Sequence, residues 1–164
     1  LILDLKKDIK TCSSCFRFFQ DQNSEITLCD ICRHPARDKS ILMLVSRDVD
    51  LENIEKTKLF KGLYFVLGGA VPILEKNPET RIRQKELVSL FNERTSNQVL
   101  KEIILGLNAT SEGENTADYI EHLLKPNSLE RGVKISHLGR GISTGTEIEY
   151  SDSETIKNAL KNRQ

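Results

Sequence analysis

The stretch Ile41-Leu42-Met43-Leu44-Val45 is a short, uninterrupted apolar run. Side chains of a strand alternate between the two faces of its sheet, so such a run is typical of a strand buried on both faces. A second run of this kind occupies residues 62–67, after a segment with helical spacing of its apolar residues. The two runs predict an α/β fold, with a mostly parallel sheet flanked by helices.

The rest of the chain continues this alternation. Strands are expected at residues 41–45, 62–67, 101–107 and 133–138, and helices between them at residues 49–59, 82–93 and 115–125. A short edge strand at residues 147–150 and a last helix at residues 154–161 complete the pattern. Sites in parallel sheets lie beyond the carboxyl ends of the strands, which points to residues 46–50, 68–72, 108–113 and 139–145.

All four cysteines lie in two CxxC pairs, Cys12 with Cys15 and Cys29 with Cys32. Two CxxC turns on facing hairpins supply four thiolates in a tetrahedral shell, the closed geometry of a structural zinc site. A redox pair is an alternative, but neither pair clearly opens a helix after a strand. Two disulfides are a third interpretation, and nothing else in the chain suggests secretion. The pattern favours one structural zinc ion.

The bulk composition limits the functional classes. The 164 residues contain 24 Lys and Arg and 24 Asp and Glu, so the formal net charge is zero and no global basic field is expected. A local basic patch remains compatible with this balance. No apolar run approaches the roughly 20 residues of a membrane span, and the start lacks a signal-peptide layout. We therefore expect a cytoplasmic protein with one core and a small appendage.

The residues before the first strand suggest two small features. Leu1, Leu5 and Ile9 share a face, which predicts the end of a helix over residues 1–10. This helix begins without a cap, as if an N-terminal portion were missing. Phe16, Phe18 and Phe19 lie between the CxxC pairs, and we expect a miniature core for a zinc knuckle over residues 11–38.

The predicted strand ends lack the ligands of a magnesium site. A Glu after the first strand and an Asp-x-Asp after the third would present three carboxylates to Mg²⁺, but Ser46, Asn108 and Thr110 occupy these positions. Asp50 and Glu112 remain, and two carboxylates from different loops hold Mg²⁺ poorly. Metal-dependent catalysis is therefore disfavoured.

Basic residues gather near the predicted knuckle and could contact phosphates. They are Arg17, Arg33, Arg37, Lys39 and Arg47. The alternative is a solvated face on which these charges are balanced by acidic neighbours. These are Asp21, Glu25, Asp30 and Asp38.

Several segments in order carry a resemblance to a known family. They are the CxxC pairs, Arg37-Asp38, Asp50-Leu51 with Glu55, Gly62-Leu-Tyr-Phe-Val-Leu-Gly-Gly69, Glu112-Gly-Glu-Asn-Thr-Ala117-Asp-Tyr-Ile, Gly139-Arg-Gly-Ile-Ser-Thr-Gly145-Thr-Glu-Ile-Glu-Tyr150-Ser-Asp152, and Thr155 with Ala159 and Leu160. From the knuckle to its end, the chain resembles the bacterial RecR family of recombination mediators. The resemblance implies a Toprim domain over residues 39–138 and a Gly-rich, helical oligomerisation segment over residues 139–164.

The resemblance also implies a function. RecR-type proteins are non-enzymatic DNA-repair factors that bind DNA and work with RecO and RecF to load RecA onto single-stranded DNA. They form dimers and tetramers that can encircle DNA, with the C-terminal segment reaching to a neighbouring subunit. With such a function, the basic residues near the knuckle, Arg17, Arg33, Arg37 and Lys39, become candidates for DNA contact. The acidic residues at Toprim motif positions, Asp50 and Glu112, become candidates for partner contact.

The chain departs from the family pattern at three places. The family's N-terminal helix-hairpin-helix is absent, which leaves DNA affinity and tetramer formation open. The position of Ser46 usually holds Glu, and the position of Phe65 usually holds His. Both departures point further from Toprim chemistry. The competing hypothesis is a Mg²⁺-dependent Toprim phosphoryl-transfer enzyme, such as a nuclease or a primase-like protein.

Overall fold

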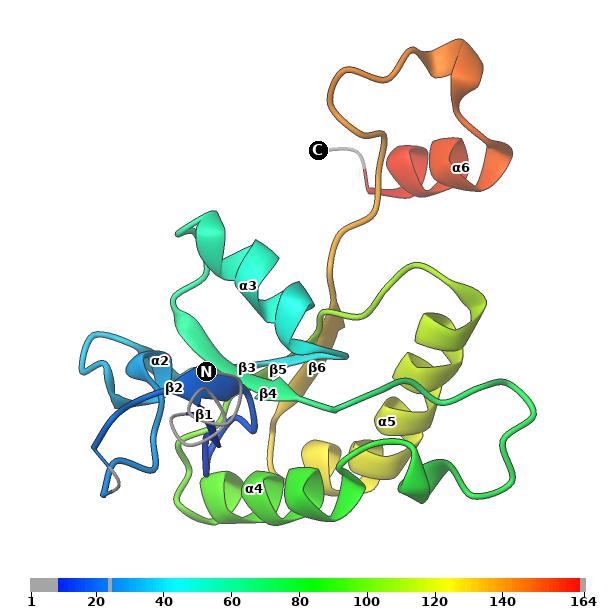
Figure 1. The fold of residues 1–164 in the computed structure, drawn as a ribbon. Helices are drawn as coiled ribbons and strands as arrows, with labels where there is room; N and C mark the ends of the chain where they lie inside the picture. Colours follow the sequence, from blue (N-terminus) through cyan, green and yellow to red (C-terminus); the bar gives the residue numbers. More distant parts are fainter. Residues whose placement is uncertain (1–8, 24, 163–164) are drawn as a thin grey trace.

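A four-stranded parallel sheet forms the centre of the molecule (Figure 1). The computed structural model describes residues 9–23 and 25–162. The strands of this sheet are β3 (Asp38–Val45), β4 (Gly62–Val66), β5 (Glu102–Leu105) and β6 (Lys134–His137). Their spatial order is β4-β3-β5-β6, and all three pairings are parallel. The predicted α/β class and parallel sheet are confirmed.

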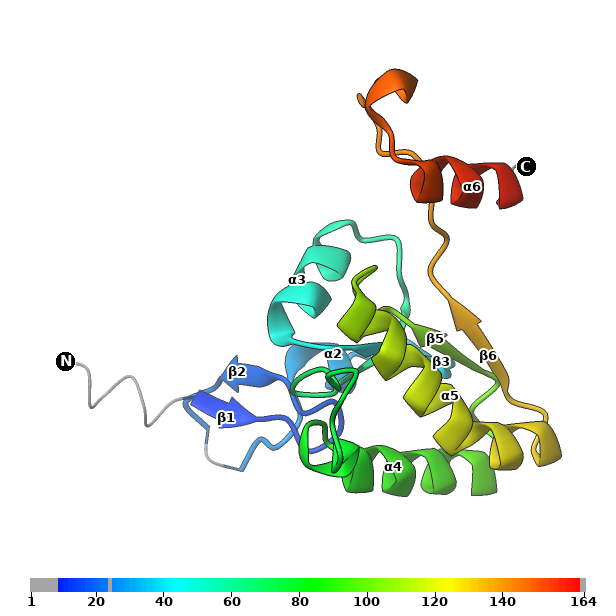
Figure 2. The same cartoon turned by 90° about the vertical axis from the view of Figure 1, so that its right-hand side faces the viewer.

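Helices cover the two faces of the sheet unequally (Figure 2). One face carries α3 (Asp48–Lys56), and the other carries α4 (Gln84–Ser96) and α5 (Ser111–Glu130). The apolar run of β3 serves both layers because Leu42 and Leu44 join the core under α4 and α5, whereas Met43 and Val45 join the core under α3. This division explains why the run contains no polar residue.

The order in which the chain adds strands to the sheet changes direction at β3. The chain leaves β3 through α3 to β4 on one side, and it returns through the short helix η1 (Pro78–Thr80) and α4 to β5 on the other side. The carboxyl ends of β3 and β5 are therefore neighbours whose connections run in opposite directions. Such a switch point is where parallel sheets usually form their sites.

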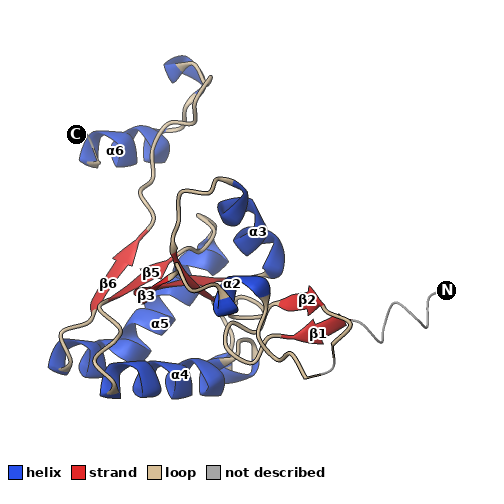
Figure 3. Cartoon of the chain, turned by 90° about the vertical axis from the view of Figure 1, so that its left-hand side faces the viewer, coloured by secondary structure: helices blue, strands red, loops and turns tan. Residues whose placement is uncertain are grey.

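The N-terminal residues form a small module at the β4 edge (Figure 3). Strands β1 (Ile9–Thr11) and β2 (Phe18–Gln20) pair antiparallel, and the short helix α2 (Asp30–Arg33) follows. The predicted helix over residues 1–10 is wrong at Ile9 and Lys10, which are in β1, and its remaining residues lie outside the described ones. The second CxxC pair begins α2, so only the first pair lies on a hairpin.

The knuckle has no separate aromatic core, contrary to the prediction. Phe16 packs against the core under α4 and α5, Phe19 packs against the core under α3, and Phe18 is largely exposed. The module is too small to enclose these rings itself, so two of them complete the cores of the neighbouring domain.

The C-terminal residues extend away from the sheet (Figures 1 and 3). The short helix η2 (Ile148–Tyr150) replaces the predicted edge strand, and α6 (Ser153–Lys161) is close to its predicted position. Residues 147–150 alternate in polarity, but among the described residues no strand lies beside them to accept their hydrogen bonds. In the described ranges, no helix is long and apolar enough to cross a lipid bilayer.

Candidate metal centre and strand-end site

The first CxxC pair is held by a tight turn between β1 and β2. The N–H of Cys12 donates to the carbonyl of Arg17 (2.9 Å), and the N–H of Phe16 donates to the carbonyl of Cys12 (3.0 Å). Phe16 adopts φ 61°, a left-handed conformation that is uncommon outside glycine. This turn leaves the Cys12 and Cys15 side chains buried and on the same side as the second pair.

The second pair meets the first at the start of α2. The N–H of Cys29 donates to Sγ of Cys12 (3.4 Å), and the Sγ atoms of Cys15 and Cys29 are 3.6 Å apart. The four Sγ atoms, including that of Cys32, all lie within 4.8 Å of one another. A tetrahedral site with Zn–S bonds of about 2.3 Å requires S···S distances of about 3.8 Å, so this arrangement fits a metal ion.

The chemistry of the cluster also suits a metal. All four cysteines are free thiols, and three of them are buried. Hydrogen bonds with Cys15, Cys29 and Cys32, in that order, lower the pKa of Cys12, and the hydrogen bond with Cys12 is the largest of the causes that raise the pKa values of Cys15 and Cys32. Within residues 9–23 and 25–162, these cysteines are the only group of three or more His, Cys, Asp or Glu residues placed to hold a metal ion.

The cysteine module is attached to β4, the strand at one edge of the sheet. The carbonyl of Cys15 accepts a hydrogen bond from the N–H of Val66 (2.8 Å), so the module continues the edge of the sheet. The Phe16 ring packs on Phe65 with 5.3 Å between centroids, and the Arg83 guanidinium lies 5.8 Å from the Phe16 centroid. Phe65, where His is expected from the resemblance, thus forms part of this junction.

The strand-end loops offer few ligands to a cation. Ser46 is 4% exposed at the end of β3. After β5, the hydroxyl of Thr110 accepts a hydrogen bond from the N–H of Gly113 (3.2 Å) and caps α5. The carbonyl oxygen of Asn108 approaches Gly113 so closely that an added Cβ would lie 2.0 Å from it. This loop is built around the start of α5, with a glycine at its tightest point.

The two acidic candidates are separate and locally engaged. The Asp50 carboxylate accepts a hydrogen bond from the N–H of Arg47 (3.0 Å) and caps the start of α3. Asp48 does not cap α3, because its carboxylate accepts from the N–H of Phe18 (2.8 Å). Glu112 is exposed in the first turn of α5.

Three of the basic candidates pair with carboxylates. Arg17 lies 3.4 Å from Asp30, and Arg33 lies 3.5 Å from Asp21. Arg37 pairs with Glu55, as described below. Lys39 and Arg47 are exposed and form no ion pair with another described residue. Acidic neighbours therefore balance part of the basic strip, which agrees with the alternative given in the sequence analysis.

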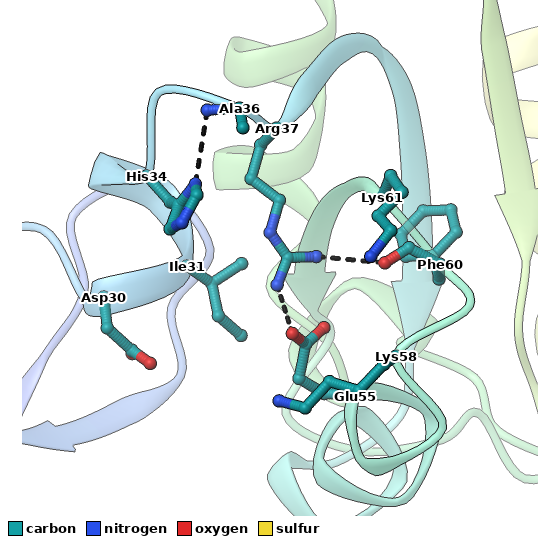
Figure 4. A pocket seen from close by; sticks show the side chains of 9 residues that line it. All are labelled: Asp30, Ile31, His34, Ala36, Arg37, Glu55, Lys58, Phe60 and Lys61. Carbon is teal, nitrogen blue, oxygen red and sulfur yellow. Dashed lines mark hydrogen bonds and ion pairs between the residues drawn. The ribbon is translucent and has the colours of Figure 1, made fainter.

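The Arg37–Glu55 pair lines a cavity of about 600 Å³ between α2 and α3 (Figure 4). Nη1 of Arg37 also donates to the carbonyls of Phe60 (3.2 Å) and Gly62 (3.3 Å). The hydroxyl of Tyr64 donates to Oε2 of Glu55 (3.0 Å). Sequence reasoning missed this network because its members are 9 to 25 positions apart.

Known protein families and related proteins match nearly the whole chain. A family model described as Toprim domain matches residues 40–139, and one described as RecR, C-terminal, matches residues 141–164. The Recombination protein RecR of Chloroherpeton thalassium is 38% identical over 162 residues, covering 99% of this chain and 76% of that protein. The Recombination protein RecR of Lactiplantibacillus plantarum is 37% identical over 164 residues, again covering 99% and 76%. The chain belongs to the RecR family.

Membership in the RecR family accounts for the order of the parts. The Toprim match covers the four-stranded sheet with its helices, and the RecR C-terminal match covers η2 and α6. The relatives also align with the cysteine module, since the matched region spans nearly the whole chain.

Proposed function

We propose that this RecR-family chain is a recombination mediator in DNA repair. It binds DNA and, together with RecO and RecF, assists the loading of RecA onto single-stranded DNA. The observation that carries this proposal is the match over 99% of the chain to proteins named Recombination protein RecR. This role would place the protein in the cytoplasm, at the nucleoid.

We further propose that the protein is not an enzyme. The support is the donor set at the switch point, where Ser46 is buried and Thr110 caps a helix. Asp50 and Glu112 then serve as contacts for a protein partner. The competing function, Mg²⁺-dependent phosphoryl transfer, needs carboxylates clustered around the ion. DNA cleavage or primer synthesis that requires Mg²⁺ and disappears in Asp50→Ala or Glu112→Ala would establish that function instead.

The ion proposed for the cysteine cluster is zinc, with a structural role. Four thiolates in a closed tetrahedral shell are a preferred zinc environment, and such a shell leaves no open position for substrate. The backbone N–H of Cys29, which points at Sγ of Cys12, supports a charged thiolate there.

The proposed DNA surface centres on Arg33 and Lys39. Both side chains are exposed on the outer side of the cysteine module and the start of β3. Arg17 and Arg37 belong to the proposed strip as well, but their side chains are only 15% and 12% exposed, whereas Arg33, although it lies 3.5 Å from Asp21, is 49% exposed. Because the chain has no net charge, removal of two exposed cations should weaken phosphate binding measurably.

A reconstituted loading reaction tests the function and the surface together. On single-stranded DNA coated with single-strand binding protein, the chain with RecO and RecF should shorten the lag before RecA ATPase activity begins. Arg33→Glu/Lys39→Glu should lose most of this effect and reduce the salt slope of DNA binding by about 1 or more. Lys76→Glu/Lys125→Glu makes the same charge change away from the module and should behave like wild type.

Two outcomes would count against these proposals. An unchanged lag with the wild-type chain would overturn the mediator function. Equal loss in both charge-reversal variants would overturn the assignment of the surface, because the effect would then follow net charge alone.

We propose that the C-terminal segment, residues 139–164, joins two copies of the chain. None of its residues within 139–162 is buried, and Tyr150 is 77% exposed. Ile148 and Leu160 are also exposed, while Ile156 and Leu160 are one turn apart on α6. An amphipathic segment without a core of its own gains stability by burying its apolar face against a partner.

Light scattering tests this association. Ile156→Asp/Leu160→Asp should shift the full chain from a dimer or larger assembly to a monomer, because it places two carboxylates on the apolar face of α6. Lys157→Asp, a change on the exposed face of the same helix, should keep the assembly. A monomeric wild-type chain at micromolar concentration would refute the proposed role of this segment.

A further inference from the structure

One arginine of the Toprim domain reaches the cysteine cluster. Arg94 lies in the last turn of α4, 80 positions from Ser14, and its Nη2 donates to Oγ of Ser14 (3.3 Å). Ser14 lies between Cys12 and Cys15 in the first CxxC turn. The guanidinium therefore touches the metal-binding turn although the two residues are far apart in the sequence.

The surroundings of Arg94 leave its charge without a conventional partner. Nη1 is buried and has no hydrogen-bond partner, and no carboxylate of a described residue forms an ion pair with this side chain. Burial lowers the pKa of Arg94, while Cys32, Glu93 and Cys15 oppose this decrease, in that order. Two of the three opposing groups are thus cysteines of the cluster. Arg94 is partly buried, and a guanidinium with a buried, unpaired nitrogen and no negative partner is costly, which calls for an anion at this place.

The metal-bound cluster would supply that anion. Four thiolates around one divalent ion carry a net charge of −2, and three of the four cysteines are buried. Backbone N–H groups such as that of Cys29 offset part of this charge, but they bring no full positive charge. We propose that Arg94 is the fixed countercharge of the metal–thiolate cluster, which strengthens metal binding and ties the cysteine module to α4. The inference rests on the proposed metal site.

Co²⁺ binding to the full chain provides the test, because tetrathiolate Co²⁺ has characteristic visible absorption. Arg94→Met removes the charge and keeps most of the apolar bulk. It should weaken Co²⁺ binding by about 10-fold or more, the usual effect of losing a partner of the ligands, with one ion per chain and an unchanged spectrum. Arg131→Met is the matched control, since Arg131 also contacts the end of α4, through Thr95 (2.6 Å), and should bind Co²⁺ like wild type.

The outcomes separate this inference from the metal site itself. If wild type binds no Co²⁺ or Zn²⁺, the metal site is wrong. If wild type binds and Arg94→Met binds equally well, only the countercharge is wrong. Should Arg94→Met fail to fold, Arg94→Lys decides, because it retains the charge. If Arg94→Lys binds Co²⁺ more than about 10-fold more weakly than wild type, then Arg94 contributes packing and not charge.

Discussion

Replacing Cys29 with alanine should abolish stoichiometric zinc binding and destabilise the whole domain, not only the cysteine module. Structural zinc sites contribute on the order of 10 kcal/mol to the folding of zinc-finger peptides. Cys12, Cys15 and Cys29 also belong to the buried cluster under α3, together with Val45 and Tyr64 of the sheet. Loss of the ion would therefore loosen the module and expose part of the core under α3.

The expected measurements are zinc content and thermal unfolding. Cys29→Ala should contain less than one zinc per chain after dialysis, and its Tm should fall by about 10 °C or more, since each kcal/mol shifts Tm by about 2–4 °C in a chain of this size. Ser13→Ala is the control, because Ser13 is exposed in the same CxxC turn and offers no thiolate. Full zinc content in Cys29→Ala would contradict the four-ligand site.

A chelator should reproduce the Cys29→Ala effect in the wild-type protein. Because the knuckle covers the edge of β4 through the Val66-to-Cys15 hydrogen bond, metal removal should raise hydrogen exchange at Val66. Exchange in α5, which lies on the other face and away from this edge, should change less. Equal exchange changes at Val66 and in α5 would mean that metal removal lowers only the global stability and that the junction with β4 does not open separately.

The parts that could be predicted from the sequence are those with a local signal. Apolar runs such as Ile41–Val45 indicate buried strands, and the spacing of the cysteines indicates a metal site. The start of β1 at Ile9 was mispredicted because its apolar residue also fits a helical repeat with Leu1 and Leu5. A three-residue strand carries too little pattern to overrule such a repeat.

Contacts between distant residues could not be predicted in this way. Arg94 carries no mark in the sequence that would assign it to Ser14, and Arg37 carries none that would pair it with Glu55. Both arginines look like surface residues until the sheet brings their partners close. Charge in a sequence indicates a solvated or binding face by default, so buried pairs are missed.

Removing one partner of the Arg37–Glu55 pair should also lower the free energy of unfolding by a large amount. The Arg37 and Glu55 side chains are only 12% and 20% exposed. Glu55→Gln leaves the guanidinium partly buried without a negative charge, and such a change costs about 3–5 kcal/mol. Asp21→Asn is the control at the Arg33–Asp21 pair, where Arg33 is 49% exposed, and it should cost less than about 1 kcal/mol.

Urea unfolding at neutral pH measures both effects, and a double variant tests their cause. Arg37→Met/Glu55→Leu replaces the pair with apolar side chains and should recover most of the stability lost in Glu55→Gln. Tyr64→Phe removes only one hydrogen bond to Glu55 and should cost about 1 kcal/mol. A double variant less stable than Glu55→Gln would mean that the two side chains contribute independently.

At acid pH, the wild-type protein should no longer be more stable than Glu55→Gln. Burial raises the pKa of Glu55, but the hydrogen bonds from Arg37 and Tyr64 and the charge of Arg37 outweigh it, so the pKa lies below its ordinary value. A lowered folded-state pKa gives a contribution that is complete above the ordinary carboxyl pKa and is lost as pH falls through the folded-state value. The difference in unfolding free energy should therefore stay constant from about pH 7 to about pH 5 and narrow as the pH falls from there to about pH 3. A difference that stays constant over this range would show that the ionised carboxylate is not what stabilises the pair.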